Sequence, residues 1–200
     1  MMRILIISNY VSRNHKEDLL IKRLNQLVKC KLTLISSQEI NNIVNDDFDA
    51  VILTGSNAFA GLPELHEYYQ DEIDYVLNYN GPILGICFGH QLLATAYNGK
   101  VSLMETRLRG FDEGFVSIKD PLFNDLPEKL FVCKAHGRIV TEIPQNIQII
   151  AHSQFVENES MKITNKPIYG VQFHPERCSD KYPHGLKILD NFLTVAKSCF

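Results

Sequence analysis

The sequence predicts an α/β fold with an open, mostly parallel, twisted sheet, helices on both faces and a small antiparallel extension. Two observations predict this fold: short apolar runs alternate with segments of helical periodicity before Gly99, and shorter β-like pieces follow it. The chain has 200 residues, 45% of them hydrophobic, which suits one substantial core. We therefore expect a single domain over residues 1–200.

The N-terminal half reads as strands that alternate with helices. Short apolar runs predict buried strands at residues 3–8, 32–35, 50–54 and 82–86. Apolar residues at helical spacing predict helices at 19–28 and 63–79, and a third that starts near Phe88. This alternation is typical of a parallel sheet covered on both faces.

After Gly99 the alternation of strands and helices gives way to short β-like segments. Short β-like pieces at 100–104, 115–118, 130–133 and 147–152 predict the antiparallel extension. A buried strand is expected at 167–173, and an apolar stripe from Leu186 to Ala196 predicts a closing helix.

Charge and composition exclude several classes of protein. The formal net charge is −3 and the basic residues are scattered, so neither nucleic acid nor an anionic membrane is an expected partner. No apolar run approaches the roughly 18 residues of a membrane helix, and we expect a cytoplasmic protein. The five cysteines are widely spaced without a CxxC pair, which argues against disulfides and zinc. Neither Cys133 with His136 nor the set His152, His174 and His184 has evident further ligands, so no metal is expected.

Cys87 stands between Gly85 and Gly89, at the junction of a predicted strand and a predicted helix. This context is typical of a nucleophile elbow, a sharp turn that exposes the nucleophile at the carboxyl end of the sheet. The glycines are expected to permit the turn, and the dipoles of the helix N–H groups favour thiolate over thiol. The alternative is a small core thiol, because free cysteine is among the most buried residue types.

A thiolate nucleophile needs a base, and the base needs a group that orients it. His174 and Glu176 supply both, directly after the predicted strand at 167–173. Pro175 is expected to keep the backbone extended, so that side chains two residues apart point the same way. His174 is then expected to face Cys87 while Glu176 fixes its tautomer. Taken separately, the two residues would be read as a core histidine and a solvated acid.

Two stretches carry a resemblance to a known family. They are Gly-Pro-Ile-Leu-Gly-Ile-Cys-Phe-Gly-His-Gln at 81–91 and Tyr-Gly-Val-Gln-Phe-His-Pro-Glu at 169–176. Both resemble motifs of the class I, or triad, glutamine amidotransferases, and the resemblance covers nearly the whole chain. It implies a flavodoxin-like fold, no cofactor, and hydrolysis of L-glutamine. In that reaction Cys87 attacks the side-chain amide, His174 protonates the leaving ammonia, and water cleaves the γ-glutamyl thioester.

The resemblance also implies roles around the nucleophile. Gln91 is expected to help hold the glutamine, and His90 to support the elbow. The oxyanion donors are expected to be the backbone N–H of Phe88 and one in the turn at 54–57. The family usually has a second glycine where Ser56 stands, and a serine there has less backbone freedom. The residues expected to contact substrate are Gly55, Ser56, Phe88, Gln91, His136 and Gly137.

Within the family, the stretches 120–127, 135–137 and 166–170 resemble the glutaminase part of GMP synthetase. That enzyme also has an ATP-pyrophosphatase domain with a Gly-rich phosphate loop, which these 200 residues lack. The resemblance therefore implies a possible ammonia acceptor in the form of a separate ATP-pyrophosphatase synthetase subunit. Arg138 stands where GMP synthetases tend to have an acid, which would alter an interface that uses this position.

Two other functions are open. A stand-alone γ-glutamyl hydrolase or peptidase would use the same triad without exporting ammonia, and Ser56 and Arg138 are the features that bear on it. A catalytically silent binding protein would keep the fold without the activity, although Cys87, His174 and Glu176 are all present.

Overall fold

The computed structural model describes residues 1–10, 16–43, 48–56 and 68–199. Within these residues, nine strands form one sheet in the order β2-β1-β3-β4-β9-β8-β7-β5-β6. The strands are β1 (Met2–Ser8), β2 (Cys30–Ser36), β3 (Ala50–Leu53), β4 (Ile83–Ile86), β5 (Lys100–Val116), β6 (Lys129–Glu142), β7 (Ile147–His152), β8 (Ser160–Ile163) and β9 (Ile168–Val171). The α-helices are α1 (Asp18–Leu27), α3 (Gln70–Asn78), α4 (Phe88–Ala96) and α5 (His184–Ser198).

Five neighbouring strands, from β2 to β9, are parallel. If only these five strands are numbered in chain order, β9 becomes the fifth and the order in the sheet is 2-1-3-4-5. This is the order of flavodoxin-like sheets. The predicted parallel sheet is thereby confirmed. The predicted helix at 63–79 corresponds to α3, although residues 63–67 lie outside the described part of the chain.

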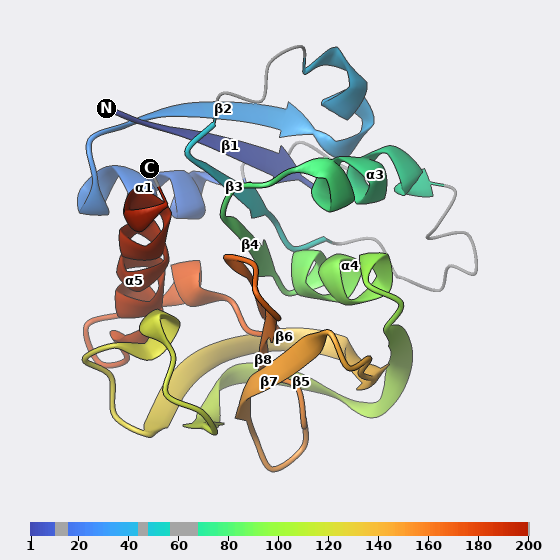
Figure 1. The fold of residues 1–200 in the computed structure, drawn as a ribbon. Coiled ribbons are helices and arrows are strands. Elements are labelled where there is room, and N and C mark those ends of the chain that lie inside the picture. The colour runs from blue at the N-terminus through green and yellow to red at the C-terminus, as the bar shows by residue number, and fades with distance from the viewer. Residues whose placement is uncertain (11–15, 44–47, 57–67, 200) are drawn as a thin grey trace.

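Helices cover both faces of the parallel part, as predicted (Figure 1). Each face of the parallel part has its own hydrophobic core, and alternate residues of β1 point into one or the other. Ile4 and Ile6 pack with residues of α1 and α5, and Leu5 and Ile7 pack with residues of α3 and α4. This period of two is the reason why strands buried on both faces read as continuous apolar runs.

The antiparallel part is larger than the small extension that the sequence predicts. It comprises β8, β7, β5 and β6, and β5 runs without a break through the predicted pieces at 100–104 and 115–118. Most side chains of β5 are exposed or half-buried, so its pairing with β6 rather than an apolar pattern defines the strand. The short strand β8 was not predicted. None of the described helices is both long and apolar enough to cross a membrane.

Candidate active site

The carboxyl ends of three adjacent parallel strands bring the predicted site residues together. Gly55 and Ser56 follow β3, Cys87 follows β4, and His174 follows β9. Because β4 pairs with both β3 and β9, these three segments meet at one edge of the sheet. Ligands of open α/β sheets bind at this edge.

Cys87 is the strained residue of the turn between β4 and α4. It stands at the N-cap of α4 with φ 52° and ψ −96°, a conformation that side-chain-bearing residues rarely adopt. Its own N–H donates to the carbonyl of Val171 at 2.8 Å, and its carbonyl accepts from Gln91 at 3.2 Å. A non-glycine residue held in this way is typical of a nucleophile elbow, and the helix N-terminus favours negative charge on its sulfur.

Gly85 and Gly89 serve the turn in a different way from the one predicted. A β-carbon at Gly85 would lie 2.5 Å from the carbonyl oxygen of Gly89, and one at Gly89 would lie 2.5 Å from the carbonyl oxygen of Leu53. The two glycines are needed because α4 lies close against β3 and β4. The unusual backbone angle falls on Cys87 itself.

His174 and Glu176 form a buried pair, with Nδ1 of His174 2.7 Å from Oε1 of Glu176. His174 is extended, but Pro175 to Arg177 form a single 3₁₀ turn rather than the extended segment that the sequence predicted. Proline suits the first position of such a turn because its missing N–H is not needed there. The turn, rather than an extended backbone, brings the carboxylate to the imidazole.

His174 makes a side-chain hydrogen bond with Cys87 on its other side. Burial lowers the pKa of His174, but the negative charges of Glu176 and Cys87 outweigh burial and raise it to about 9. Burial likewise raises the pKa of Glu176, yet the imidazolium beside it keeps the pKa below its usual range. The favoured state near neutral pH is therefore a charged His174 beside an anionic Glu176.

Two backbone segments are placed to stabilise an oxyanion beside Cys87. The N–H of Phe88, at the first position of α4, has no hydrogen-bond acceptor among the described residues. A β-carbon at Gly55 would lie 3.0 Å from Cε1 of His174 and 3.7 Å from Cβ of Cys87, so this backbone runs directly against the triad. Ser56 contacts the hydroxyl of Tyr69 through a side-chain hydrogen bond.

The turn after β3 is held from behind by Asn9. The Asn9 N–H donates to the hydroxyl of Thr54 at 2.9 Å, and its side-chain amide donates to the Thr54 carbonyl at 3.3 Å and to Glu72 at 3.1 Å. The Thr54 hydroxyl in turn donates to the carbonyl of Gly55 at 2.9 Å. These bonds restrain the segment expected to provide an oxyanion donor.

A pocket of about 530 Å³ opens beside the sulfur. Its wall includes Cys87, His174 and five of the six residues expected to contact substrate, namely Ser56, Phe88, Gln91, His136 and Gly137. Gly55 lies beneath it, against Cys87. Glu176 lies behind His174 and is nearly fully buried.

Gln91 and His136 are oriented by the same carbonyl, that of Arg138. Nε2 of Gln91 donates to this oxygen at 3.0 Å, and Nδ1 of His136 lies 3.2 Å from it. Because a carbonyl only accepts, Nδ1 of His136 carries the proton, and the amide oxygen of Gln91 has no partner among the described residues. Burial, followed by the charge of Lys134, lowers the pKa of His136 to about 4, so the ring is neutral.

His90 is completely buried on α4, and burial lowers its pKa to about 3. A β-carbon at Gly170 would lie 2.6 Å from Nδ1 of His90, so the imidazole fills the space between α4 and β9. This position beneath the elbow fits the supporting role expected from the sequence.

The sequence reasoning missed several residues around the site, among them Tyr10, Arg107, Gln172 and Arg177. Burial, followed by the charge of Glu176, raises the pKa of Tyr10 to about 12. Gln172 precedes His174 by two positions in the stretch 167–173 that the sequence predicts as a strand, so the period of two was an available signal. In the structure β9 ends at Val171 and the chain bends at 172–173. Arg107 lies in a bulge of β5, which no local pattern indicates.

No group of three or more His, Cys, Asp or Glu side chains suited to hold a metal ion occurs in the part of the chain that the structure describes.

A strained cysteine at the carboxyl edge of a flavodoxin-like sheet, hydrogen-bonded to a histidine–glutamate pair, defines an enzyme of the cysteine-nucleophile class. The chain belongs to the class-I glutamine amidotransferase family, whose model matches residues 6–196. The predicted family and the predicted class of enzyme are confirmed.

Curated relatives are similar along almost the whole chain. One of them, a subunit of the glutamine-hydrolysing GMP synthase of Methanocaldococcus jannaschii, is 36% identical over 195 residues, which cover 96% of each chain. The protein of the same name from Methanothermobacter thermautotrophicus is 32% identical over 199 residues, or 99% of this chain and all of the other.

Solved structures support the fold. A putative GMP synthase subunit from Thermoplasma acidophilum superposes with a TM-score of 0.84 at 24% identity, over 100% of this chain and 96% of that chain. A glutamine amidotransferase from Thermotoga maritima superposes with a TM-score of 0.78 at 19% identity, over 98% of each chain.

Proposed function

We propose that this protein hydrolyses L-glutamine to glutamate and supplies the ammonia to a separate synthetase subunit that makes GMP. The observation that carries the proposal is the hydrogen-bonded set Cys87, His174 and Glu176 at the wall of an open pocket. The similar proteins are named as subunits of a glutamine-hydrolysing GMP synthase, which supports GMP as the product made with the ammonia.

In the first step, the sulfur of Cys87 attacks the side-chain amide carbon of glutamine. The carbonyl oxygen becomes an oxyanion, for which the N–H of Phe88 and a backbone N–H of Gly55 or Ser56 are the proposed donors. As the C–N bond breaks, His174 gives its proton to the leaving nitrogen and ammonia departs. The product is a γ-glutamyl thioester on Cys87.

In the second step, His174 takes a proton from water, which attacks the thioester carbon. The C–S bond breaks, glutamate leaves and the thiolate is restored. Glu176 holds the imidazole and stabilises its charged form throughout. We assign to Gln91, His136 and Gly137 the task of holding the amino-acid part of the substrate, because they line the same pocket as Cys87 and His174.

The acceptor that we propose is an ATP-pyrophosphatase subunit that activates the nucleotide. The chain spans 96% of the length of its Methanocaldococcus jannaschii relative, which is itself named as one subunit. We place the reaction in the cytoplasm, and the five cysteines, all free thiols, suit a reducing compartment.

Replacement of the nucleophile tests the chemistry. We expect Cys87→Ala and Cys87→Ser to abolish glutamine hydrolysis while the unfolding transition persists, because the thiolate carries the covalent step. Glutamate release and thermal unfolding are the measurements, and Cys199→Ser, which changes an exposed cysteine, is the matched control. Undiminished hydrolysis by Cys87→Ala would refute the mechanism.

The identity of the acceptor is tested by mixing. Glutaminase rate is measured with and without an ATP-pyrophosphatase subunit plus its nucleotide substrates, beside a panel of γ-glutamyl peptides. Stimulation by the subunit, together with GMP formation, is the expected result. Strong peptide cleavage without stimulation would instead favour the stand-alone γ-glutamyl hydrolase.

A further inference from the structure

Gln172 lies next to the nucleophile and is completely buried. Its side-chain Nε2 donates to the sulfur of Cys87 at 3.8 Å, and its backbone N–H donates to the carbonyl of Glu159 at 2.8 Å. The proposed reaction gives this side chain no step.

The direction of this hydrogen bond follows from two others. The Arg138 carbonyl can only accept, so the side-chain nitrogen of Gln91, 3.0 Å away, faces it. The same nitrogen lies 3.0 Å from Oε1 of Gln172 and donates its second hydrogen there. With its oxygen thus occupied, Gln172 must present its nitrogen to the sulfur of Cys87.

A fixed donor beside a buried sulfur favours the charged form of that sulfur. A thiolate accepts hydrogen bonds, and bonds to charged groups are about twice as strong as bonds between neutral groups. The donor is also held in place before reaction, because Gln91 and the Arg138 carbonyl restrain it on one side and the Glu159 carbonyl restrains its backbone.

We infer that Gln172 is a positioning residue that stabilises the Cys87 thiolate, with its orientation set by Gln91 and the carbonyl of Arg138. The inference rests on the proposed role of Cys87 as nucleophile. It adds a third influence on the sulfur, beside the charge of His174 and the N-terminus of α4.

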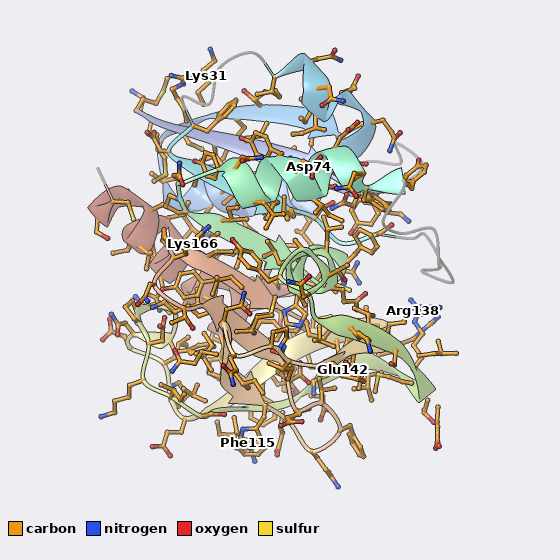
Figure 2. All side chains as sticks on the ribbon, turned by 45° about the vertical axis from the view of Figure 1, so that its right-hand side comes forward. Lys31, Asp74, Phe115, Arg138, Glu142 and Lys166 are labelled. Carbon is orange, nitrogen blue, oxygen red and sulfur yellow. The ribbon has the colours of Figure 1, made fainter. Side chains whose placement is uncertain are left out.

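The chain of bonds leads from the sulfur to the surface. Arg138 lies at the edge of the molecule beside β5 (Figure 2), and it lines the opening of the pocket. A change in the backbone at this position would therefore reach the thiolate through two side chains.

The test follows alkylation of Cys87 by iodoacetamide as a function of pH, without glutamine, by mass spectrometry of the peptide that contains it. We expect Gln172→Met to slow alkylation near neutral pH about tenfold, which corresponds to about 1.4 kcal/mol, and to move the midpoint of the profile upward. At high pH, where every thiol is ionised, the rates should converge. Gln148→Met, which changes an exposed glutamine on β7, is the matched control and should match the wild type.

Other titratable groups surround the sulfur and are left intact by these variants, namely His174, Glu176, Tyr10, Arg177 and His136. A change in midpoint therefore reports the loss of the donor. A residue with only a packing role would alter thermal unfolding without moving the midpoint.

A second variant tests how Gln172 is oriented. Gln91→Met should slow alkylation in the same direction but less, and the double variant should be no slower than Gln172→Met, because Gln91 acts through Gln172. An unchanged profile in both single variants, or fully additive losses, would overturn the inference. The alkylation test contains no glutamine and therefore does not depend on the proposed function. Failure of the wild type to hydrolyse glutamine in a separate assay would contradict the proposed function instead.

Discussion

Cys87 carries a strained backbone that only its surroundings maintain. A residue held in such a region costs about 1–3 kcal/mol, which the close packing of α4 on β3 and β4 must offset. The strain turns the sulfur toward His174, Gln172 and the pocket. At this scale, geometry and charge act together: the segment after β9 supplies both His174 and Gln172, and α4 presents its N-terminus to the same sulfur.

The charge on His174 leads to a prediction about pH. Its pKa is raised to about 9, so the protonated form is present at neutral pH and is lost as the pH rises through that value. Hydrolysis should therefore decline on the alkaline side near pH 9. In Glu176→Gln the attraction of the carboxylate is lost while burial, which lowers the pKa, remains.

We expect the alkaline limb of kcat/KM in Glu176→Gln to move to lower pH, with reduced activity at neutral pH. A pH–rate profile of glutamine hydrolysis is the measurement. Glu142→Gln, at an exposed pair with Lys100, is the control and should keep the wild-type profile. A limb that stays near pH 9 in Glu176→Gln would contradict the assigned cause.

The long strand β5 shapes the pocket through an irregularity. Its Leu103 pairs with Arg138 and its Leu108 pairs with His136, so residues 104–107 lie opposite Gly137 alone. Such bulges are common beside active sites because they redirect side chains. Here the bulge contributes Met104, Glu105 and Arg107 to the pocket wall.

Helix α3 contributes a buried carboxyl group behind the site. Glu72 accepts from the side chain of Asn9, which also holds the turn after β3. Burial raises the pKa of Glu72 to about 8, although the Asn9 bond lowers it, so the group is mostly neutral at pH 7. The folded state then binds this proton more strongly than the unfolded chain does.

The sign of the pH effect follows from linkage. The stability that Glu72 contributes is complete below its ordinary pKa of 4.5 and is lost as the pH rises through about 8. Glu72→Gln cannot titrate. We therefore expect its free energy of unfolding, relative to the wild type, to increase from pH 5 to pH 9, by an amount on the order of a few kcal/mol.

Denaturant unfolding at several pH values measures this difference. Glu128→Gln, which changes an exposed acid, is the control and should follow the wild type at every pH. A constant difference between Glu72→Gln and the wild type would show that Glu72 is ionised in the folded protein.

The whole molecule places the pocket between the carboxyl edge of the parallel strands and the β5–β6 pair. The parallel strands supply Cys87 and His174, and the β5–β6 pair supplies the opposite wall. The opening carries an exposed apolar residue, Leu103, beside Arg107 and Arg138.

We expect an acceptor subunit to cover this opening, so that Leu103 becomes buried in the complex. Leu103 is 72% exposed, and a charge there would have to be desolvated on docking. Leu103→Asp should therefore lower the ratio of partner-stimulated to basal glutaminase activity. Phe155→Asp, at a 58% exposed residue outside the pocket wall, is the matched control. An unchanged ratio in Leu103→Asp would exclude this face as the docking surface.

Much of the parallel sheet was predictable because its strands are buried on both faces and read as apolar runs. The grouping of Cys87, His174 and Glu176 was predictable because the two motifs that hold them follow strands whose carboxyl ends meet. The antiparallel part was predicted only in fragments, since the side chains of β5 are mostly exposed or half-buried and its backbone pairing with β6 defines it, while β8 has four residues including a lysine.

The sequence by itself determined the family, the proposed nucleophile and the residues that follow each parallel strand, because motifs and apolar runs are local features of the chain. Only the tertiary structure decided how those residues act on one another. Three features depend on segments far apart in the chain. They are the strain on Cys87, the 3₁₀ turn that brings Glu176 to His174, and the direction of the hydrogen bond that Gln91 donates to Gln172. A hydrogen bond needs its partner within about 3 Å, and no local pattern specifies that distance.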